Sequence, residues 1–240
     1  MTEAQVIIGV PGKWKNRTEL IQAVAIKSEG YLMAGHFIHN AKKNIGFQAE
    51  VYKQDPNLKE AFSYASRNTF DDNLLNEIEQ HTFTVYVTAN VNGFEDLKEV
   101  VNVGAALLKS GGLAVKIETS GIAHTKDRWY QLVKNQDYFP IYSHFAILIG
   151  DEESYSSFGM KAFGLPDVIV PSSILPEEAT DLLNNFNLYN LVDKPTIKSG
   201  ETFSLDEHSP IYRIQSIKDF RYEEDDIFFN PFGLLDLKPV

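Results

Sequence analysis

Polar and apolar side chains alternate regularly in residues 82–89, Thr-Phe-Thr-Val-Tyr-Val-Thr-Ala. Side chains two residues apart point to the same face of a strand, so Phe83, Val85 and Val87 share one face and the polar residues between them share the other. This pattern predicts a half-buried strand. Helix and strand patterns continue on both sides, and we expect this strand to be shared by the α/β layers before and after it.

The residues before this strand predict the order β-α-β-β-α-β over residues 4–90. The expected segments are a strand at 6–10, a helix from Thr18 to Gly30, strands at 31–39 and 46–52, and helices at 58–66 and after Asp71 or Asp72. This order is that of the split βαβ, or ferredoxin-like, fold. In that fold two helices cover one face of an antiparallel sheet, and both crossovers are right-handed.

The residues after the shared strand predict a second α/β unit. It comprises a helix at 97–108, a strand at 113–117, a helix at 126–133, strands at 142–149 and 155–163, and a helix at 175–188. We therefore predict an α+β, two-layer sandwich that forms a single compact unit over 1–240. The similar alternation of strands and helices in the two parts suggests pseudo-duplicated halves, 1–90 and 81–205, followed by a loop-rich acidic tail at 206–240.

Composition excludes several classes of protein. The 240 residues contain 22 Lys and Arg against 33 Asp and Glu, and the net charge of −11 argues against a nucleic-acid-binding surface. The sequence has no cysteine, which excludes disulfides, thiolate metal sites and cysteine nucleophiles. No apolar run approaches the roughly 20 residues that span a membrane, and the start lacks a basic signal-peptide region. We expect a cytoplasmic protein.

Charge is distributed unevenly along the chain. Residues 1–70 hold nine basic and six acidic groups, whereas residues 201–240 hold four basic and nine acidic groups, the densest run being Glu223–Asp226. This run is either a solvated loop or a docking surface for a basic partner. Nearby aromatic residues are either interface anchors or core; they are Phe220, Tyr222, Phe228, Phe229 and Phe232.

The segment from Glu118 to His124 is a candidate catalytic site. It follows a predicted strand and precedes a predicted helix, and sites often form at the carboxyl ends of strands in α/β proteins. Glu118, Ser120 and His124 supply a carboxylate, a hydroxyl and an imidazole, the groups of acid–base or nucleophilic chemistry. The alternative is structural, with Thr125 or the preceding polar groups capping the helix at 126–133.

Two further motifs do not support a metal or cofactor site. His36 and His39 lie in a predicted strand, where side chains three residues apart point to opposite faces. Gly9-x-Pro11-Gly12 lacks the Lys-Ser/Thr ending of a phosphate-binding loop and the spacing of a dinucleotide-binding loop. We therefore predict a tight turn at Pro11-Gly12, no metal site and no bound cofactor.

The most distinctive segment is 158–167, Phe-Gly-Met-Lys-Ala-Phe-Gly-Leu-Pro-Asp. Glycine permits positive φ or close backbone approach, and proline restricts the direction in which the chain leaves. The segment predicts a constrained turn against the core, and the alternative is the wall of a binding groove. The candidate binding residues are Gly159, Met160, Phe163, Gly164 and Asp167.

The order of several short motifs resembles an uncharacterised family of bacterial proteins that is catalogued as a domain of unknown function. The motifs are His81, Ser120-Gly121-x-x-His124, Gly159-Met160-x-x-Phe163-Gly164-Leu165-Pro166-Asp167 and Lys198-Ser199-Gly200-Glu201-Thr202. The resemblance covers roughly residues 80–205. It implies a stand-alone cytosolic bacterial protein, and it implies no activity, cofactor or catalytic residue.

Three functions are compatible with these observations. The favoured hypothesis is a protein-interaction or accessory module, for example of the immunity type, whose partner has a basic surface. The second is a small hydrolase or transferase that uses the Glu118–His124 segment, and the third is a small-ligand sensor on the α/β scaffold. The sequence leaves the oligomeric state open.

Overall fold

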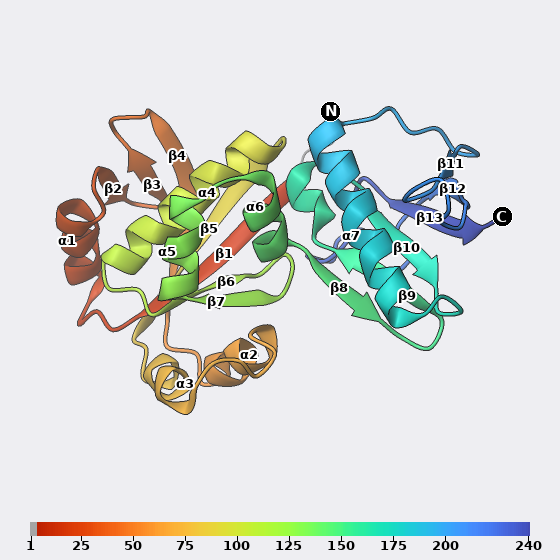
Figure 1. Ribbon diagram of the computed structural model, residues 1–240. Coiled ribbons are helices and arrows are strands. Elements are labelled where there is room, and N and C mark those ends of the chain that lie inside the picture. The colour runs from red at the N-terminus through yellow and green to blue at the C-terminus, as the bar shows by residue number, and fades with distance from the viewer. Residues whose placement is uncertain (1–3) are drawn as a thin grey trace. The chain divides into compact units, whose positions relative to one another are not determined.

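The computed structural model describes residues 4–240, which form two compact units (Figure 1). The first unit comprises Gln5–Asn90 and Glu95–Gln136, and the second comprises Val91–Phe94 and Asp137–Val240 together with Ala4. Helices and largely antiparallel sheets confirm the α+β class. The single compact unit with pseudo-duplicated halves stays a prediction. Within residues 4–240, every helix is too short or too polar to cross a bilayer.

The first unit contains a seven-stranded sheet in the order β2-β3-β4-β5-β1-β6-β7. Its strands are β1 (Ala4–Gly12), β2 (Tyr31–Ala34), β3 (Phe37–Asn40), β4 (Ile45–Lys53), β5 (Phe83–Val91), β6 (Ala114–Ile117) and β7 (Ile122–Thr125). Five helices belong to it: α1 (Arg17–Lys27), α2 (Leu58–Ala65), α3 (Asp72–Glu79), α4 (Phe94–Lys109) and α5 (Lys126–Lys134). The strand predicted at 82–89 is thus confirmed as β5, inside the sheet.

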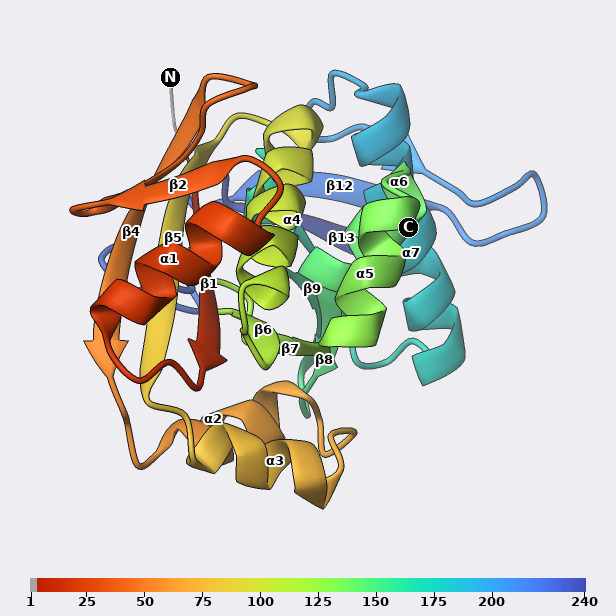
Figure 2. The same ribbon diagram turned by 90° about the vertical axis from the view of Figure 1, so that its left-hand side faces the viewer.

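The observed strand order differs from the ferredoxin-like order predicted for residues 4–90. That prediction places residues 46–52 beside β1, whereas β5 lies between β4 and β1, with Ala49 of β4 opposite Val87 of β5. Figure 2 shows α1 and α4 over the same face of the sheet, and α2 and α3 at one end of it. The order differs because β4 and β5, which α2 and α3 connect, pair directly as antiparallel neighbours. Phe62 of α2 and Ile78 of α3 belong to one buried cluster with Leu113.

The single strand predicted at 31–39 is wrong, because the chain turns back at Gly35. This glycine has a φ of 58°, which an L side chain rarely adopts. Strands β2 and β3 pair across the turn, with Met33 opposite Ile38. His36 therefore lies in the turn and His39 in β3, so the two imidazoles do not belong to one strand.

The second unit contains a six-stranded sheet in the order β11-β12-β13-β10-β9-β8. Its elements are α6 (Tyr138–Phe145), β8 (Ile147–Gly150), β9 (Ser154–Phe158), the 3₁₀ helix η1 (Met160–Phe163), β10 (Asp167–Pro171), α7 (Pro176–Asp193), β11 (Thr202–Phe203), β12 (Tyr212–Ile217) and β13 (Leu234–Pro239). Helix α7 covers one face, where Phe186 and Leu182 pack on Val168, Val170 and Leu237.

Two predictions for this part of the chain are wrong in detail. The strand predicted at 142–149 begins as helix α6, because a short apolar run without alternation fits either element. The strand predicted at 155–163 ends at Phe158, since Gly159 has a φ of 109° and starts η1. The tail at 206–240 supplies β12 and β13, and β13 lies between β12 and β10 in the sheet.

Candidate binding site of the second unit

The predicted catalytic residues lie on the hairpin formed by β6 and β7. The carboxylate of Glu118 pairs with the ammonium group of Lys116 at 2.5 Å. His124 is buried in β7 beside the ring of Trp129, and Ser120 Oγ is buried without a hydrogen-bond partner in the described structure. The hydroxyl–imidazole hydrogen bond that activates a serine is therefore missing. The catalytic assignment stays a prediction.

The structural alternative for this segment is confirmed at its end. The hydroxyl of Thr125 accepts a hydrogen bond from the Arg128 amide at 3.3 Å and caps α5. Asp71 caps α3 in the same way through the Leu74 amide. Over residues 4–240, no three histidine, aspartate or glutamate side chains gather as a metal site requires.

The segment 158–167 forms the constrained turn that its glycines predict. A Cβ atom at Gly159 would lie 2.3 Å from the carbonyl oxygen of Phe145, and Gly164 has a φ of 72°. The amide of Met160 donates a hydrogen bond to Asp167 Oδ1 at 3.0 Å, which closes the turn. Phe163 and the other candidate residues of this segment lie in the protein interior, except for the partly exposed Gly164.

Asp167 belongs to a buried ionic cluster, which we define as Lys161, Asp167, Asp219, Arg221 and Asn230. The guanidinium of Arg221 donates to Asp167 Oδ2 at 2.7 Å and, through Nε and Nη2, to both oxygens of Asp219 at 3.0 and 3.1 Å. Its Nη1 donates to the carbonyl oxygen of Ser157 at 2.9 Å. The guanidinium is thus held by two carboxylates that are almost fully buried.

Asn230 and Lys161 tie the loop between β12 and β13 to the same cluster. The side-chain amide of Asn230 donates to Asp167 Oδ2 at 3.0 Å, and its backbone amide donates to Asp219 Oδ2 at 3.1 Å. The ammonium group of Lys161 donates to the carbonyl oxygens of Ile227 and Phe229. These contacts fix residues 219–230 against the turn at 159–167.

Burial and ion pairing compete within the buried ionic cluster. Burial raises the pKa of Asp167, and Arg221 and Asn230 oppose that rise. Burial would also raise the pKa of Asp219, but its hydrogen bonds from Arg221 outweigh burial and the pKa is lowered. Burial lowers the pKa of Lys161 to about 8, against the attraction of the nearby aspartates.

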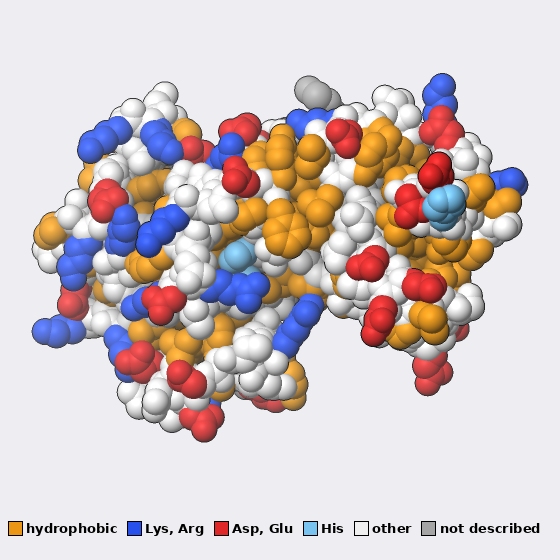
Figure 3. Space-filling model, in the orientation of Figure 1, with side chains coloured by type: hydrophobic (Ala, Val, Ile, Leu, Met, Phe, Trp, Pro, Cys, Tyr) orange, Lys and Arg blue, Asp and Glu red, His pale blue; other side chains and the backbone are white. Residues whose placement is uncertain are grey.

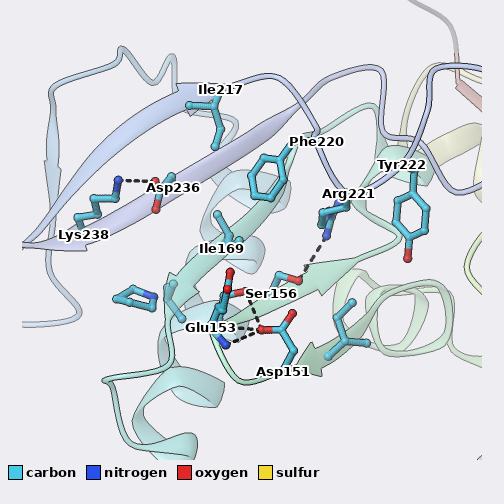
Figure 4. Close-up of a pocket in the computed structure, with 14 residues that line it drawn as sticks. Asp151, Glu153, Ser156, Ile169, Ile217, Phe220, Arg221, Tyr222, Asp236 and Lys238 are labelled. Atoms are coloured by element: carbon cyan, nitrogen blue, oxygen red, sulfur yellow. Dashed lines mark hydrogen bonds and ion pairs between the residues drawn. The ribbon is translucent and has the colours of Figure 1, made fainter.

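A groove of about 410 Å³ lies on the sheet face opposite α7 (Figure 4). Side chains alternate along a strand, so Ile169 and Asp236 line the groove while Val168 and Leu237 face α7. The lining residues come from five strands, the β8–β9 turn and the loop after β12; they are Ile149, Asp151, Glu153, Ser154, Ser156, Ile169, Val170, Pro171, Ile217, Phe220, Arg221, Tyr222, Asp236 and Lys238.

One side of the groove is aromatic and the other is acidic. Figure 4 shows Ser156 between Phe220 on one side and Asp151 and Glu153 on the other. The Phe220 side chain is 69% exposed, although it is a large apolar group. Asp151 Oδ1 accepts the amides of residues 153 and 154 at 2.8 Å, and these hydrogen bonds lower the pKa of Asp151.

Sequence reasoning missed most of the buried ionic cluster. It selected Asp167 from the glycine-rich segment but not Lys161, Asp219, Arg221 or Asn230. The available signal was weak: Asp219-Phe-Arg221 places two opposite charges near the acidic run, and aromatic residues follow. Arg221 and Asp167 are 54 residues apart in the chain, so no local pattern joins them.

The net charge of the protein is concentrated in residues 137–240. They hold seven Lys and Arg against eighteen Asp and Glu, a net charge of −11, whereas residues 1–136 hold fifteen of each. In Figure 3, acidic side chains outnumber basic ones on the visible face of the second unit, and Lys and Arg gather on the first unit. The groove therefore lies in the strongly anionic part of the chain.

Comparison with known proteins gives a match to one family over part of the chain, and this match indicates no activity. No curated protein and no solved structure shows a significant match to the chain. The family match begins in β9 and ends in β13, so it contains the whole buried ionic cluster and most of the groove. It includes the Gly159–Asp167 and Lys198–Thr202 motifs, whereas His81 and the Ser120–His124 motif lie outside it. Residues 156–237 match the family described as Domain of unknown function (DUF4261), in agreement with the predicted resemblance to a domain of unknown function.

Proposed function

We propose that the second unit is a protein-interaction module that binds a basic surface of a partner protein. The observation that supports this proposal is the location of the entire net charge, −11, in residues 137–240. Charge of one sign on one unit steers an oppositely charged partner and repels partners of like charge. Nucleic acids are polyanions, so the same charge disfavours them.

The second unit also offers a rigid surface for recognition. Arg221, Asp219 and Lys161 fix the loop that carries Phe220, so the exposed aromatic side chain is supported by buried hydrogen bonds. A supported aromatic group loses less conformational entropy on binding than one on a free loop. Aromatic anchors beside charged groups are typical of protein interfaces.

The scaffold that we infer for the first unit is ferredoxin-like. Strands β4, β5, β1 and β6 lie in this order, and α1 and α4 follow β1 and β5 in the chain. This is the order of a split βαβ unit, in which β2–β3 and α2–α3 are insertions and β7 is an addition. Such a scaffold specifies no function by itself, so the proposal rests on the second unit.

Hydrogen exchange of the full chain tests the proposal. The probe is a hexa-arginine peptide, and the matched control is hexa-glutamate. We expect hexa-arginine to protect amides within residues 137–240 and to lose affinity as salt rises, because salt screens exposed charges. Protection confined to residues 5–136, or equal binding of hexa-glutamate, would contradict the proposal.

A further inference from the structure

We infer that the groove of the second unit binds an arginine side chain on an extended segment of the basic partner, an inference that rests on the proposed function. The groove volume of about 410 Å³ is within the range of sites that hold one ligand group, and it opens to solvent along the sheet. A partner segment can therefore lie across the strands and place one long side chain between the two walls.

The aromatic wall suits a planar cation. Phe220, which is 69% exposed, lines the groove together with Tyr222. A guanidinium group stacks on an aromatic face and is more weakly hydrated than an ammonium group. The neighbourhood already contains one such contact, since the Arg221 guanidinium lies 5.7 Å from the centre of the Phe158 ring.

The acidic wall offers unsatisfied carboxylate oxygens. Within the described structure, neither Asp151 nor Glu153 forms an ion pair with a lysine or arginine. The three hydrogen bonds to Asp151 all reach Oδ1, which leaves Oδ2 for a ligand. Asp236, the third acid of the groove, is paired with Lys238 at 3.0 Å. Asp151 and Glu153 are therefore the groups available to a cation.

Neither cation that lines the groove favours an anionic ligand, because Lys238 is paired with Asp236 at 3.0 Å and Arg221 is held by buried carboxylates. Arg221 directs Nε and Nη2 to Asp219 and Asp167, and Nη1 to the carbonyl oxygen of Ser157. Two buried carboxylates balance its single charge, so the guanidinium has neither free charge nor a strong free donor for a ligand. The lining thus selects a positive group with hydrogen-bond donors in one plane.

Fluorescence anisotropy with labelled nonapeptides tests the site. The peptides are identical Gly-Ser-Thr sequences that carry arginine, lysine or citrulline at the centre, citrulline being the uncharged analogue of arginine. We expect the arginine peptide to bind about tenfold more tightly than the other two at roughly 0.15 M salt. Equal binding of the lysine or citrulline peptide would overturn the arginine site.

Variants of the full chain locate the binding. We expect Phe220→Ser, and separately Asp151→Asn with Glu153→Gln, to weaken arginine-peptide binding about tenfold. The matched control, Glu223→Gln with Asp225→Asn, removes the same charge outside the groove and should change binding less than about twofold. Equal losses of arginine-peptide binding in the groove variants and in the control variant would overturn the groove site but leave the proposed function intact. Binding of hexa-arginine without binding of the single-arginine peptide would have the same consequence. Unchanged circular dichroism shows that each variant is folded.

Discussion

Replacing Arg221 with alanine removes the centre of the buried ionic cluster. The guanidinium donates two hydrogen bonds to Asp219, one to Asp167 and one to the carbonyl oxygen of Ser157. Both carboxylates are almost completely buried, so water cannot replace the lost donors. The variant therefore leaves two desolvated acids without their cation.

The expected cost follows from that loss. Removing one partner of a buried ion pair destabilises a protein by about 3–5 kcal/mol, because an uncompensated charge stays buried. Asp167 keeps hydrogen bonds from Met160 and Asn230, and Asp219 keeps one from Asn230. These contacts place the expected loss in the free energy of unfolding of the second unit in the lower half of that range, about 3–4 kcal/mol.

The loss should depend on pH in a defined direction. In the wild type, Arg221 opposes the rise in the pKa of Asp167 that burial causes. Without the guanidinium this pKa rises further above its unfolded value. Such an acid stabilises the fold while protonated, and the stabilisation is lost as pH rises through the folded pKa. The deficit of R221A should thus be largest near neutral pH and shrink as pH falls.

Urea unfolding followed by far-ultraviolet circular dichroism measures this deficit at about pH 7 and about pH 4.5. Hydrogen exchange in β10 and β13 assigns it to the second unit, since both tryptophans, Trp14 and Trp129, belong to the first. The matched control is R213A, which removes an exposed arginine of β12 and should change stability by less than about 0.5 kcal/mol. Equal losses for R221A and R213A, or an R221A deficit independent of pH, would refute the reasoning.

Three other substitutions test separate features of the fold. Gly159→Ala should cost at least about 3 kcal/mol by thermal unfolding, because φ is 109° and the new Cβ would lie 2.3 Å from the Phe145 carbonyl oxygen; a cost below about 1 kcal/mol would contradict the turn geometry. Gly104→Ala should cost about 1–3 kcal/mol by tryptophan fluorescence, because its Cβ would lie 2.8 Å from the ring of Trp129; a neutral effect would contradict this packing. The pKa of Lys161 is lowered from 10.5 to about 8, so its neutral form favours the fold. In urea unfolding, the free energy of unfolding of the wild type relative to that of Lys161→Met should therefore rise by about 1–3 kcal/mol between pH 8 and pH 10.5. A difference that does not change with pH would show that Lys161 is not desolvated.

Local patterns predicted single elements better than their arrangement. The alternation in residues 82–89 identified β5, and Asp71 and Thr125 cap the helices that they were expected to cap. The prediction of one strand at 31–39 is wrong because Gly35 permits a turn, and hydrophobic periodicity does not indicate such a turn. The order of β1, β4 and β5 is set by pairing between strands distant in sequence, since β5 pairs directly with β4 and lies between β4 and β1.

The candidate site was predicted only in part. The glycines at 159 and 164 indicated a constrained turn, and Asp167 was selected with them. The turn does not line the groove itself, which is formed in part by Phe220 and Asp151 on two separate connections. Residues on different loops come together only after the strands pair, so their proximity has no signature in sequence spacing.

By itself, the amino-acid sequence determined the class of the fold, its capped helices and the acidic charge of residues 137–240, because these depend on neighbouring residues or on composition. Only the tertiary structure decided that Arg221 joins Asp167 with Asp219 and that the open sheet face beside them forms a groove. The physical reason is that burial makes an ion pair strong and selective, and burial is a property of the packed chain rather than of any segment.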